Sequence, residues 1–371
     1  MPDSIDAAIH LSQARVRGHD LDLLRAHFGT LQEAIQASST ELCKAGLSEH
    51  RARAVLAVDP ESVVSTQNWL DEADHSLLVR GDSDFPELLS DIDDPPSVLY
   101  VNGDVDSLHL PSIAIVGSRN PTRGGERNAS DFAEFLAGNG FCIVSGLATG
   151  IDSHAHQGAL RAGGKTVAFL GHGIDRVYPA ANRELAHRIV GQGALVSEYP
   201  LGVPPDKRHF PQRNRLISGL TVGTLVVEAA RRSGSLITAR LAGEQGKEVF
   251  ALPGSIHNPL SRGCHELIRS GAKLVENAGE IVSEVAHLTG LMLQNAMEST
   301  TLPVAESETN SEHKLVLEML EHDPSDIDTL ARQSGLTIDQ LSSMLLILEL
   351  EEKVEKLSGG QYAILHQTSR S

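Results

Sequence analysis

One short stretch of the chain is unusually rich in groups that bind phosphate. Residues 207–215 read Lys-Arg-His-Phe-Pro-Gln-Arg-Asn-Arg and so combine four cations with one aromatic ring. Guanidinium groups pair with phosphate oxygens, and an exposed phenylalanine stacks on a nucleobase. Pro204 and Pro205 before the stretch and Pro211 within it restrict the backbone. The pattern predicts a preorganised nucleic-acid surface; a solvated basic turn with Phe210 in the core is the alternative.

The elements that position this stretch are predicted from the alternation of apolar and helical segments. Six apolar segments, separated by helical ones, are expected to form strands: 112–117, 141–146, 166–171, 194–197, 224–228 and 248–253. Buried strands that alternate with helices are typical of a doubly wound parallel sheet, in which ligands bind at the carboxyl ends of the strands.

Glycine-rich loops follow three of these strands, at 117–119, 145–152 and 171–173. Glycine lets backbone N–H groups approach an anion closely, and the start of a helix adds partial positive charge. Several such loops at one edge of the sheet favour a phosphate site, although each glycine taken singly could merely end a strand.

Long motifs in this part of the chain resemble the DNA-processing protein A family (DprA/Smf). They are Ile-Val-Gly-Ser-Arg at 115–119, Ser-Gly-Leu-Ala-Thr-Gly-Ile-Asp at 145–152, Phe-Pro-Gln-Arg-Asn-Arg-Leu-Ile-Ser-Gly-Leu at 210–220, Ser-Gly-Ser-Leu-Ile-Thr-Ala-Arg at 233–240, Pro-Gly-Ser at 253–255 and Gly-Cys-His-Glu-Leu-Ile at 263–268. The resemblance covers about residues 75–288. It implies an extended Rossmann-like domain without catalytic activity or cofactor, which protects single-stranded DNA and loads the recombinase RecA in natural transformation and homologous recombination.

The resemblance also implies where DNA binds. Arg119 and Lys207 match the family's phosphate contacts. The rest of the expected DNA site consists of Phe210, Arg213, Asn214, Arg215, Gly117, Ser118, Ser145 and Gly146. A homodimer is implied as well, and we expect it to form through residues 255–275.

The ends of the chain are expected to form smaller domains around the extended Rossmann-like domain of residues 75–290. Residues 1–74 indicate a small all-α domain, sterile-alpha-motif-like or helix-hairpin-helix-like. Residues 291–311 are rich in Ser, Thr and Glu and indicate a flexible linker. Residues 312–371 have the element order of a winged helix, three helices followed by a hairpin.

The charge of the chain is unevenly distributed. The formal net charge is −18, yet residues 112–287 contain more Lys and Arg than Asp and Glu. The expected third helix of the winged helix, residues 337–350, has no Lys or Arg. Because duplex binding depends on neutralising phosphates, we expect the winged helix not to read DNA.

Composition excludes several other classes of protein. No apolar run is long enough to span a membrane, and the acidic N-terminus does not indicate a secretory signal. Three scattered cysteines indicate neither a disulfide framework nor a zinc site, and no other metal site is expected. We therefore expect a reduced, cytoplasmic protein.

An enzyme is the alternative function. Glu228 with Ser233-Gly234-Ser235 distantly resembles the Rossmann-like nucleoside-monophosphate phosphoribohydrolases. Those enzymes carry a Pro-Gly-Gly-x-Gly-Thr loop, and the equivalent stretch here lacks that run of glycines. The basic stretch at 207–215 is also more than a small nucleotide needs, which favours a DNA-binding protein.

Overall fold

The chain forms two compact units, Met1–Ala296 and Met297–Ser371, in the computed structural model. The structure describes residues 5–286 continuously and, nearer the C-terminus, residues 316, 319–320, 325–334, 336–337, 341, 345, 348, 353–356 and 361–364. The linker predicted at 291–311 lies outside the described residues.

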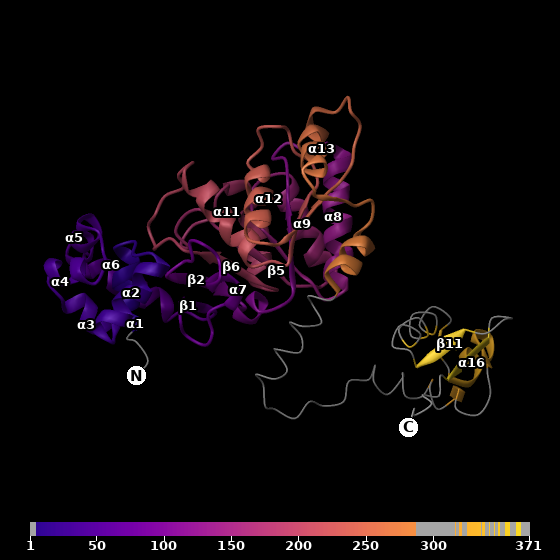
Figure 1. Cartoon of the computed structure of the whole chain (residues 1–371), viewed down its shortest axis with the longest axis horizontal. Coiled ribbons are helices and arrows are strands. Elements are labelled where there is room, and N and C mark those ends of the chain that lie inside the picture. Colours follow the sequence, from indigo (N-terminus) through magenta and orange to yellow (C-terminus); the bar gives the residue numbers. More distant parts are fainter. Residues whose placement is uncertain are drawn as a thin grey trace, which may run out of the picture. The chain divides into compact units, whose positions relative to one another are not determined.

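Six short helices begin the first unit (Figure 1). They are α1 (Ile5–Gln13), α2 (Gly18–Phe28), α3 (Leu31–Gln36), α4 (Ser39–Lys44), α5 (Glu49–Leu56) and α6 (Pro60–Leu70). Side chains of Thr30, Ser38, Ser48 and Asp59 accept hydrogen bonds from the first turns of α3, α4, α5 and α6, which satisfies backbone N–H groups at the helix starts. The all-helical character predicted for this region is confirmed.

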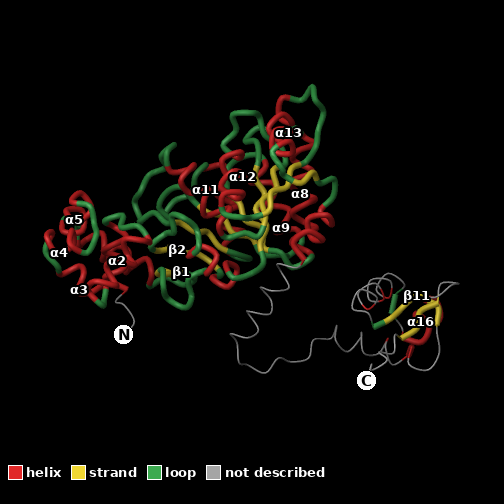
Figure 2. The backbone as a smooth tube through the Cα atoms, in the orientation of Figure 1, coloured by secondary structure: helices red, strands yellow, loops and turns green. Residues whose placement is uncertain are grey.

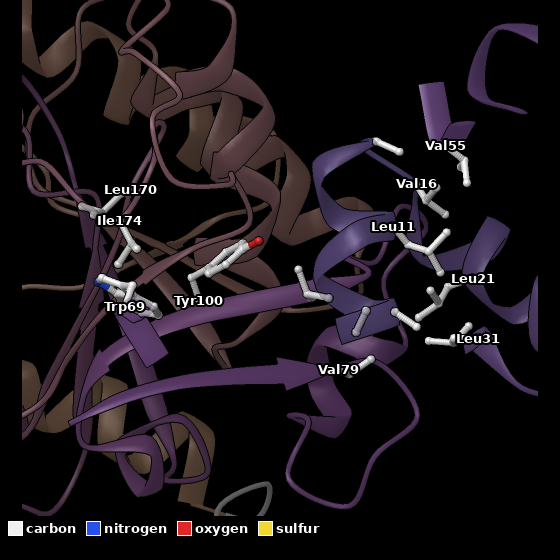
Figure 3. Close-up of a cluster of buried hydrophobic side chains, with 14 of the residues drawn as sticks. Leu11, Val16, Leu21, Leu31, Val55, Trp69, Val79, Tyr100, Leu170 and Ile174 are labelled. Atoms are coloured by element: carbon white, nitrogen blue, oxygen red, sulfur yellow. The ribbon is translucent and has the colours of Figure 1, made fainter. Parts of the chain in front are cut away.

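The helices share a hydrophobic core with the strands that follow. Leu11, Leu21 and Leu31 of the helices belong to one buried cluster with Tyr100 and Leu170 of the sheet region (Figure 3). The boundary predicted at residue 74 therefore falls inside a single compact unit.

A nine-stranded sheet forms the centre of the first unit. Its strands are β1 (His75–Val79), β2 (Val98–Gly103), β3 (Ser112–Val116), β4 (Cys142–Ser145), β5 (Thr166–Phe169), β6 (Ala194–Ser197), β7 (Gly223–Val226), β8 (Glu248–Ala251) and β9 (Lys273–Leu274). They lie in the order β1-β2-β6-β5-β4-β3-β7-β8-β9. The strands from β6 to β9 in this order pair in parallel, so the predicted doubly wound parallel sheet is confirmed.

Two strands extend the sheet in the antiparallel sense. β2 pairs with β6, and β1 pairs with β2, where Leu78 lies opposite Leu99. β1 was not predicted from the sequence. Five residues next to a segment rich in Asp and Pro are too few to show a clear period.

Helices cover both faces of the sheet (Figure 2). They are α7 (Glu87–Ser90), α8 (Arg123–Gly138), α9 (Ile151–Arg161), α10 (Arg183–Val190), α11 (His209–Gly219), α12 (Ser235–Glu244) and α13 (Arg262–Arg269), with 3-10 turns at Val105–Leu108, Ala180–Asn182 and Pro259–Ser261. Alternate residues of β3 face opposite sides: Ala114 lies in the cluster with Leu216 of α11, and Ile113 in the cluster with Leu136 of α8.

The second unit has its own core. Its described elements are β10 (Ser325–Asp326), α16 (Ile327–Ser334), β11 (Val354–Lys356) and β12 (Gln361–Ile364), with the strands in the order β10-β12-β11. β11 and β12 form the expected antiparallel hairpin, in which Val354 lies opposite Ile364. Leu341, Leu345 and Leu348 are buried in this core, so these apolar groups stabilise the unit itself.

Candidate nucleic-acid interface

A pocket of about 570 Å³ lies at the carboxyl ends of the parallel strands. The loop after β3 contributes Gly117 and Arg119, and the loop between β6 and α11 contributes Lys207. α11 adds Phe210 and Asn214. Residues that are nearly a hundred positions apart in the chain thus meet in one place, as the rule for doubly wound sheets predicts.

Two unpaired cations border the pocket. Arg119 and Lys207 are both exposed, and neither forms an ion pair with a described residue. An anion that enters the pocket therefore meets positive charges that no carboxylate of the described chain already neutralises.

Two aromatic rings stand beside these cations. Phe210 is half-buried, and its ring centroid lies 5.8 Å from that of Tyr178, which is 50% exposed. The Arg119 guanidinium lies 5.8 Å from the Phe210 centroid. The ring of Phe210 therefore lies on the wall of the pocket, contrary to the alternative that placed it in the core.

Gly171 makes room for the Phe210 ring. A Cβ atom on Gly171 would lie 2.9 Å from Cδ1 of Phe210, closer than real contacts allow. Gly171, which follows β5, thus leaves the space that the Phe210 ring occupies. The sequence did not predict Tyr178 as a site residue, because it is an isolated aromatic residue in a loop far from the basic stretch.

Arg213 borders the pocket but is a buried residue rather than a free phosphate contact. It is 4% exposed, and its Nη1 donates hydrogen bonds to the carbonyl oxygens of Gly146, at 3.0 Å, and Phe169. Burial lowers the pKa of Arg213 to about 10, and the nearby Asp152 carboxylate opposes that shift. Arg213 therefore stays charged at neutral pH while its donors are used inside the protein.

Arg215 lies on the other side of α11, so the prediction that it completes the same pocket is wrong. Its Nη1 and Nη2 donate to Oε1 and Oε2 of Glu198 at 2.7 and 2.6 Å, and its Nε donates to the carbonyl of Asp94 at 2.7 Å. Successive helical residues turn by about 100°, which places Arg213 and Arg215 on opposite faces.

The loop after β4 shapes the pocket from behind. The Ser145 hydroxyl is buried and donates to the carbonyl of Ile115 at 2.7 Å, and the Gly146 amide donates to Asp152 Oδ2 at 3.1 Å. A Cβ atom on Gly146 would lie 2.7 Å from the Arg213 guanidinium. Neither Ser145 nor Gly146 is among the residues that line the pocket; their hydrogen bonds hold the loop behind it in place.

The loop after β3 is held by its neighbours. The Ser118 amide donates to the carbonyl of Glu228 at 2.7 Å, and the Ser118 hydroxyl accepts from the Asn120 amide at 3.1 Å. A Cβ atom on Gly117 would lie 2.6 Å from Ile151 Cγ1, so the close packing of α9 requires glycine there. Gly117 lines the pocket, and Ser118 supports it.

Hydroxyl groups complete the opposite wall. Ser233, Ser235 and Thr238, at the start of α12, line the pocket. The hydroxyl oxygens of Ser233 and Ser235 are 2.7 Å apart, and Asn214 Nδ2 donates to the carbonyl of Gly234 at 3.5 Å. This wall offers further polar groups to a bound ligand.

Glu228 is occupied elsewhere. It is buried, and its carboxylate accepts hydrogen bonds from the Thr122 amide at 2.9 Å and the Thr122 hydroxyl at 2.7 Å. Thr122 is the N-cap of α8, so this carboxylate stabilises the start of that helix. Glu228, the carboxylate of the enzyme alternative, is not among the residues that line the pocket.

Within the described ranges, no three His, Cys, Asp or Glu side chains gather as metal ligands would. No helix in the same ranges has both the length and the apolar character needed to cross a membrane.

Comparison with known proteins gives consistent matches. Residues 76–286 match the family model described as DNA recombination-mediator protein A, and residues 300–360 match the DprA winged helix domain. The protein Smf of Escherichia coli (strain K12) is 40% identical over 342 residues, which cover 91% of this chain and 90% of that protein.

Two solved structures are similar to the chain. The X-ray structure of DNA processing protein A from Streptococcus pneumoniae has a TM-score of 0.66 and 34% identity, and covers 76% of this chain and 99% of that one. DNA processing protein A from Helicobacter pylori, whose structure gave insights into a unique single-stranded DNA binding mode, has a TM-score of 0.53 and 32% identity, with coverage of 57% and 96%.

Proposed function

The chain belongs to the DNA recombination-mediator protein A family, and on that premise we propose that its pocket binds single-stranded DNA. The related protein from Helicobacter pylori is described as a single-stranded DNA binder, which supports this ligand class. The observation that carries the proposal is the pairing of two unneutralised cations, Arg119 and Lys207, with the rings of Phe210 and Tyr178 in one pocket.

The two kinds of group have different roles in this proposal. The cations neutralise backbone phosphates, whereas the rings stack on bases whose faces are exposed only in a single strand. Stacking tolerates any base, because every base has a flat π-surface. The pocket is therefore suited to strands of varied sequence.

We further propose that the bound strand is protected and then passed to the recombinase RecA, which the protein loads. The membership in a recombination-mediator family supports a role of this kind. The proposed cellular settings are natural transformation and homologous recombination, in the cytoplasm. A non-enzymatic role accords with the engagement of Glu228 by Thr122.

A homodimer through residues 255–275 is part of the proposal. This segment contains α13 and runs to β9, the edge strand of the sheet. Ile256 is 72% exposed and Leu274 is 44% exposed. An edge strand with exposed apolar side chains nearby is a surface that a second copy of the chain could cover.

A binding experiment tests the function directly. We expect fluorescently labelled single-stranded oligonucleotides to bind the wild-type chain. The double variant Arg119→Ala/Lys207→Ala should bind them more weakly. Its plot of log affinity against log salt concentration should have a slope flatter by about 1.4, or about 0.7 for each lost phosphate contact. Arg161→Ala is the matched control. Arg161 ends α9 and so lies toward the opposite edge of the sheet, where it pairs with Glu134.

Three outcomes would contradict the proposal. Wild-type protein that fails to bind oligonucleotides would remove the ligand class, and an unchanged salt slope in Arg119→Ala/Lys207→Ala would remove this pocket. Release of a base from nucleoside monophosphates would establish the enzyme alternative. RecA loading is tested separately, by whether the chain speeds filament formation on single strands coated with a single-strand-binding protein.

A further inference from the structure

A second, smaller pocket lies on the far side of α11. It has a volume of about 280 Å³ and is formed between the turn after α1 and the segments that flank β2 and β6. Arg15 and Arg17 of that turn line it together with Glu198, Tyr199 and Arg215. The site thus joins the N-terminal helices to the sheet region within one compact unit.

α11 is the wall that the two pockets share. Phe210 and Asn214 face the first pocket, whereas Gln212 and Arg215 face the second. His209, the first residue of α11, precedes Phe210 directly. The two pockets therefore lie on either side of the amino-terminal end of one helix.

A stack of side chains supports Arg15 at this end of α11. The rings of His209 and Tyr199 are stacked with centroids 4.4 Å apart, and the Arg15 guanidinium lies 5.1 Å from the Tyr199 centroid. Tyr199 is 5% exposed, whereas Arg15 is exposed. The buried ring thus supports a guanidinium that remains open to solvent.

Arg15 occupies a backbone position that favours glycine. Its φ is 56°, and the bonds Arg15 N–H to Ser12 C=O at 2.8 Å and Val16 N–H to Leu11 C=O at 3.0 Å form the Schellman motif that ends α1. Glycine is the usual residue at this position, because a side chain strains the left-handed conformation. A long cationic side chain stands here although the local backbone does not favour it.

Each carboxylate that lines this pocket already has an arginine partner. Arg215 pairs with both Glu198, at 2.6 Å, and Asp94, at 3.3 Å. Arg51, another residue of the pocket lining, pairs with Asp20.

The acidic group nearest to α11 in sequence is also paired. Asp206, just before the helix, pairs with Arg208 at 3.0 Å. In contrast, neither Arg15 nor Arg17 forms an ion pair with any described residue. Although Glu198 and Asp94 share one arginine, the lining residues with their ion-pair partners keep a positive balance because of Arg15 and Arg17.

We propose that Arg15 and Arg17 form a second contact site for the same DNA strand. In this proposal a DNA strand leaves the first pocket, crosses the amino-terminal end of α11 and contacts the turn after α1. The planar Arg15 guanidinium offers a bidentate phosphate contact or a surface for a base. The inference rests on the proposed function of the first pocket and deepens it.

Arg15→Gly is the decisive variant, because it removes the guanidinium while it suits the backbone. We expect its melting temperature to equal or exceed that of wild type. For an oligonucleotide just long enough to fill the first pocket, the affinity should not change. For one twice as long, affinity should fall roughly fourfold near 0.15 M salt and the salt slope should flatten by about 0.7, as expected for one lost phosphate contact. Arg53→Ala, which removes a cation that is 73% exposed on α5, serves as the control.

The outcomes separate the two proposals. If wild-type protein binds neither oligonucleotide, the proposed function itself fails. If Phe210→Ala weakens binding but Arg15→Gly binds both lengths like wild type, the first pocket stands and the second site is overturned. Equal weakening of both lengths by Arg15→Gly would also overturn it, because Arg15 would then act through the Tyr199–His209 stack on the first pocket.

Discussion

Arg213 donates a 3.0 Å hydrogen bond to the carbonyl oxygen of Gly146 and thereby joins α11 to the loop after β4. The same guanidinium donates to Phe169 at the end of β5. Two strand ends and the helix that carries Phe210 are thus held together by one buried side chain. Since a preorganised surface loses less entropy on binding, the buried arginine supports the pocket by holding its walls together.

Arg213→Ala should destabilise the protein strongly. The change leaves the carbonyls of Gly146 and Phe169 without these partners and removes the positive charge near the buried Asp152. Each buried acceptor that loses its partner costs about 1–3 kcal/mol. Urea unfolding measures this free energy, with Arg161→Ala, which removes an exposed arginine, as the control. A decrease in the free energy of unfolding of less than about 0.5 kcal/mol, which is typical of surface positions, would contradict the structural role of Arg213.

Phe210→Ala and Tyr178→Ala should weaken DNA binding without a change in salt dependence. A stacked ring contributes about 1–3 kcal/mol per base and neutralises no phosphate. Fluorescence anisotropy at several salt concentrations measures both the affinity and the slope. Gly171→Ala provides a matched test, because its methyl group would push on the Phe210 ring and leave every cation in place. Unchanged affinity in Phe210→Ala would show that the ring only packs.

Acid should destabilise the fold through His156. This side chain is fully buried; its Nδ1 donates to the Thr166 hydroxyl at 2.7 Å, and Thr166 in turn donates to the carbonyl of Ile143 at 2.6 Å. Burial lowers the pKa of His156 to about 3 from its usual value of 6.5. The unfolded chain therefore takes up a proton below pH 6.5 that the folded chain does not, and stability falls as the pH drops from 6.5 toward 3.

The size of this loss of stability follows from the same difference in proton binding between the folded and unfolded chain. Between pH 7 and pH 5 the wild-type free energy of unfolding should fall by about 2 kcal/mol more than that of His156→Gln, which has no group that titrates in this range. Urea unfolding at the two pH values gives the comparison. Parallel decreases in both proteins would show that His156 does not carry the acid sensitivity.

Deletion of residues 297–371 should leave the affinity for single strands intact. These residues form a compact unit of their own, and acidic residues outnumber basic ones in it. Removing negative charge does not weaken attraction to phosphate and slightly favours it. A loss of affinity of tenfold or more, about 1.4 kcal/mol, would show that this unit contributes to binding.

The resemblance to the family and the alternation of segments were enough to predict the sheet and the edge at which the site lies. Each predicted strand was a run of apolar residues between turn signals, and such a signal is local. The rule that ligands bind at the carboxyl ends then placed Gly117, Arg119, Lys207 and Phe210 together. Contact of these residues with DNA stays a prediction.

Which side chains remain open to a ligand was decided by the tertiary structure alone. Arg213 and Arg215 look equivalent in the sequence, yet the docking of α11 buries the first against Gly146 and pairs the second with Glu198. Burial and pairing depend on which helix face meets the sheet, and residues distant in the chain set that orientation. For the same reason the sequence alone did not predict that Tyr178 lies beside Phe210 or that Arg15 lies beside Tyr199. These contacts form only when separate loops and helices pack together.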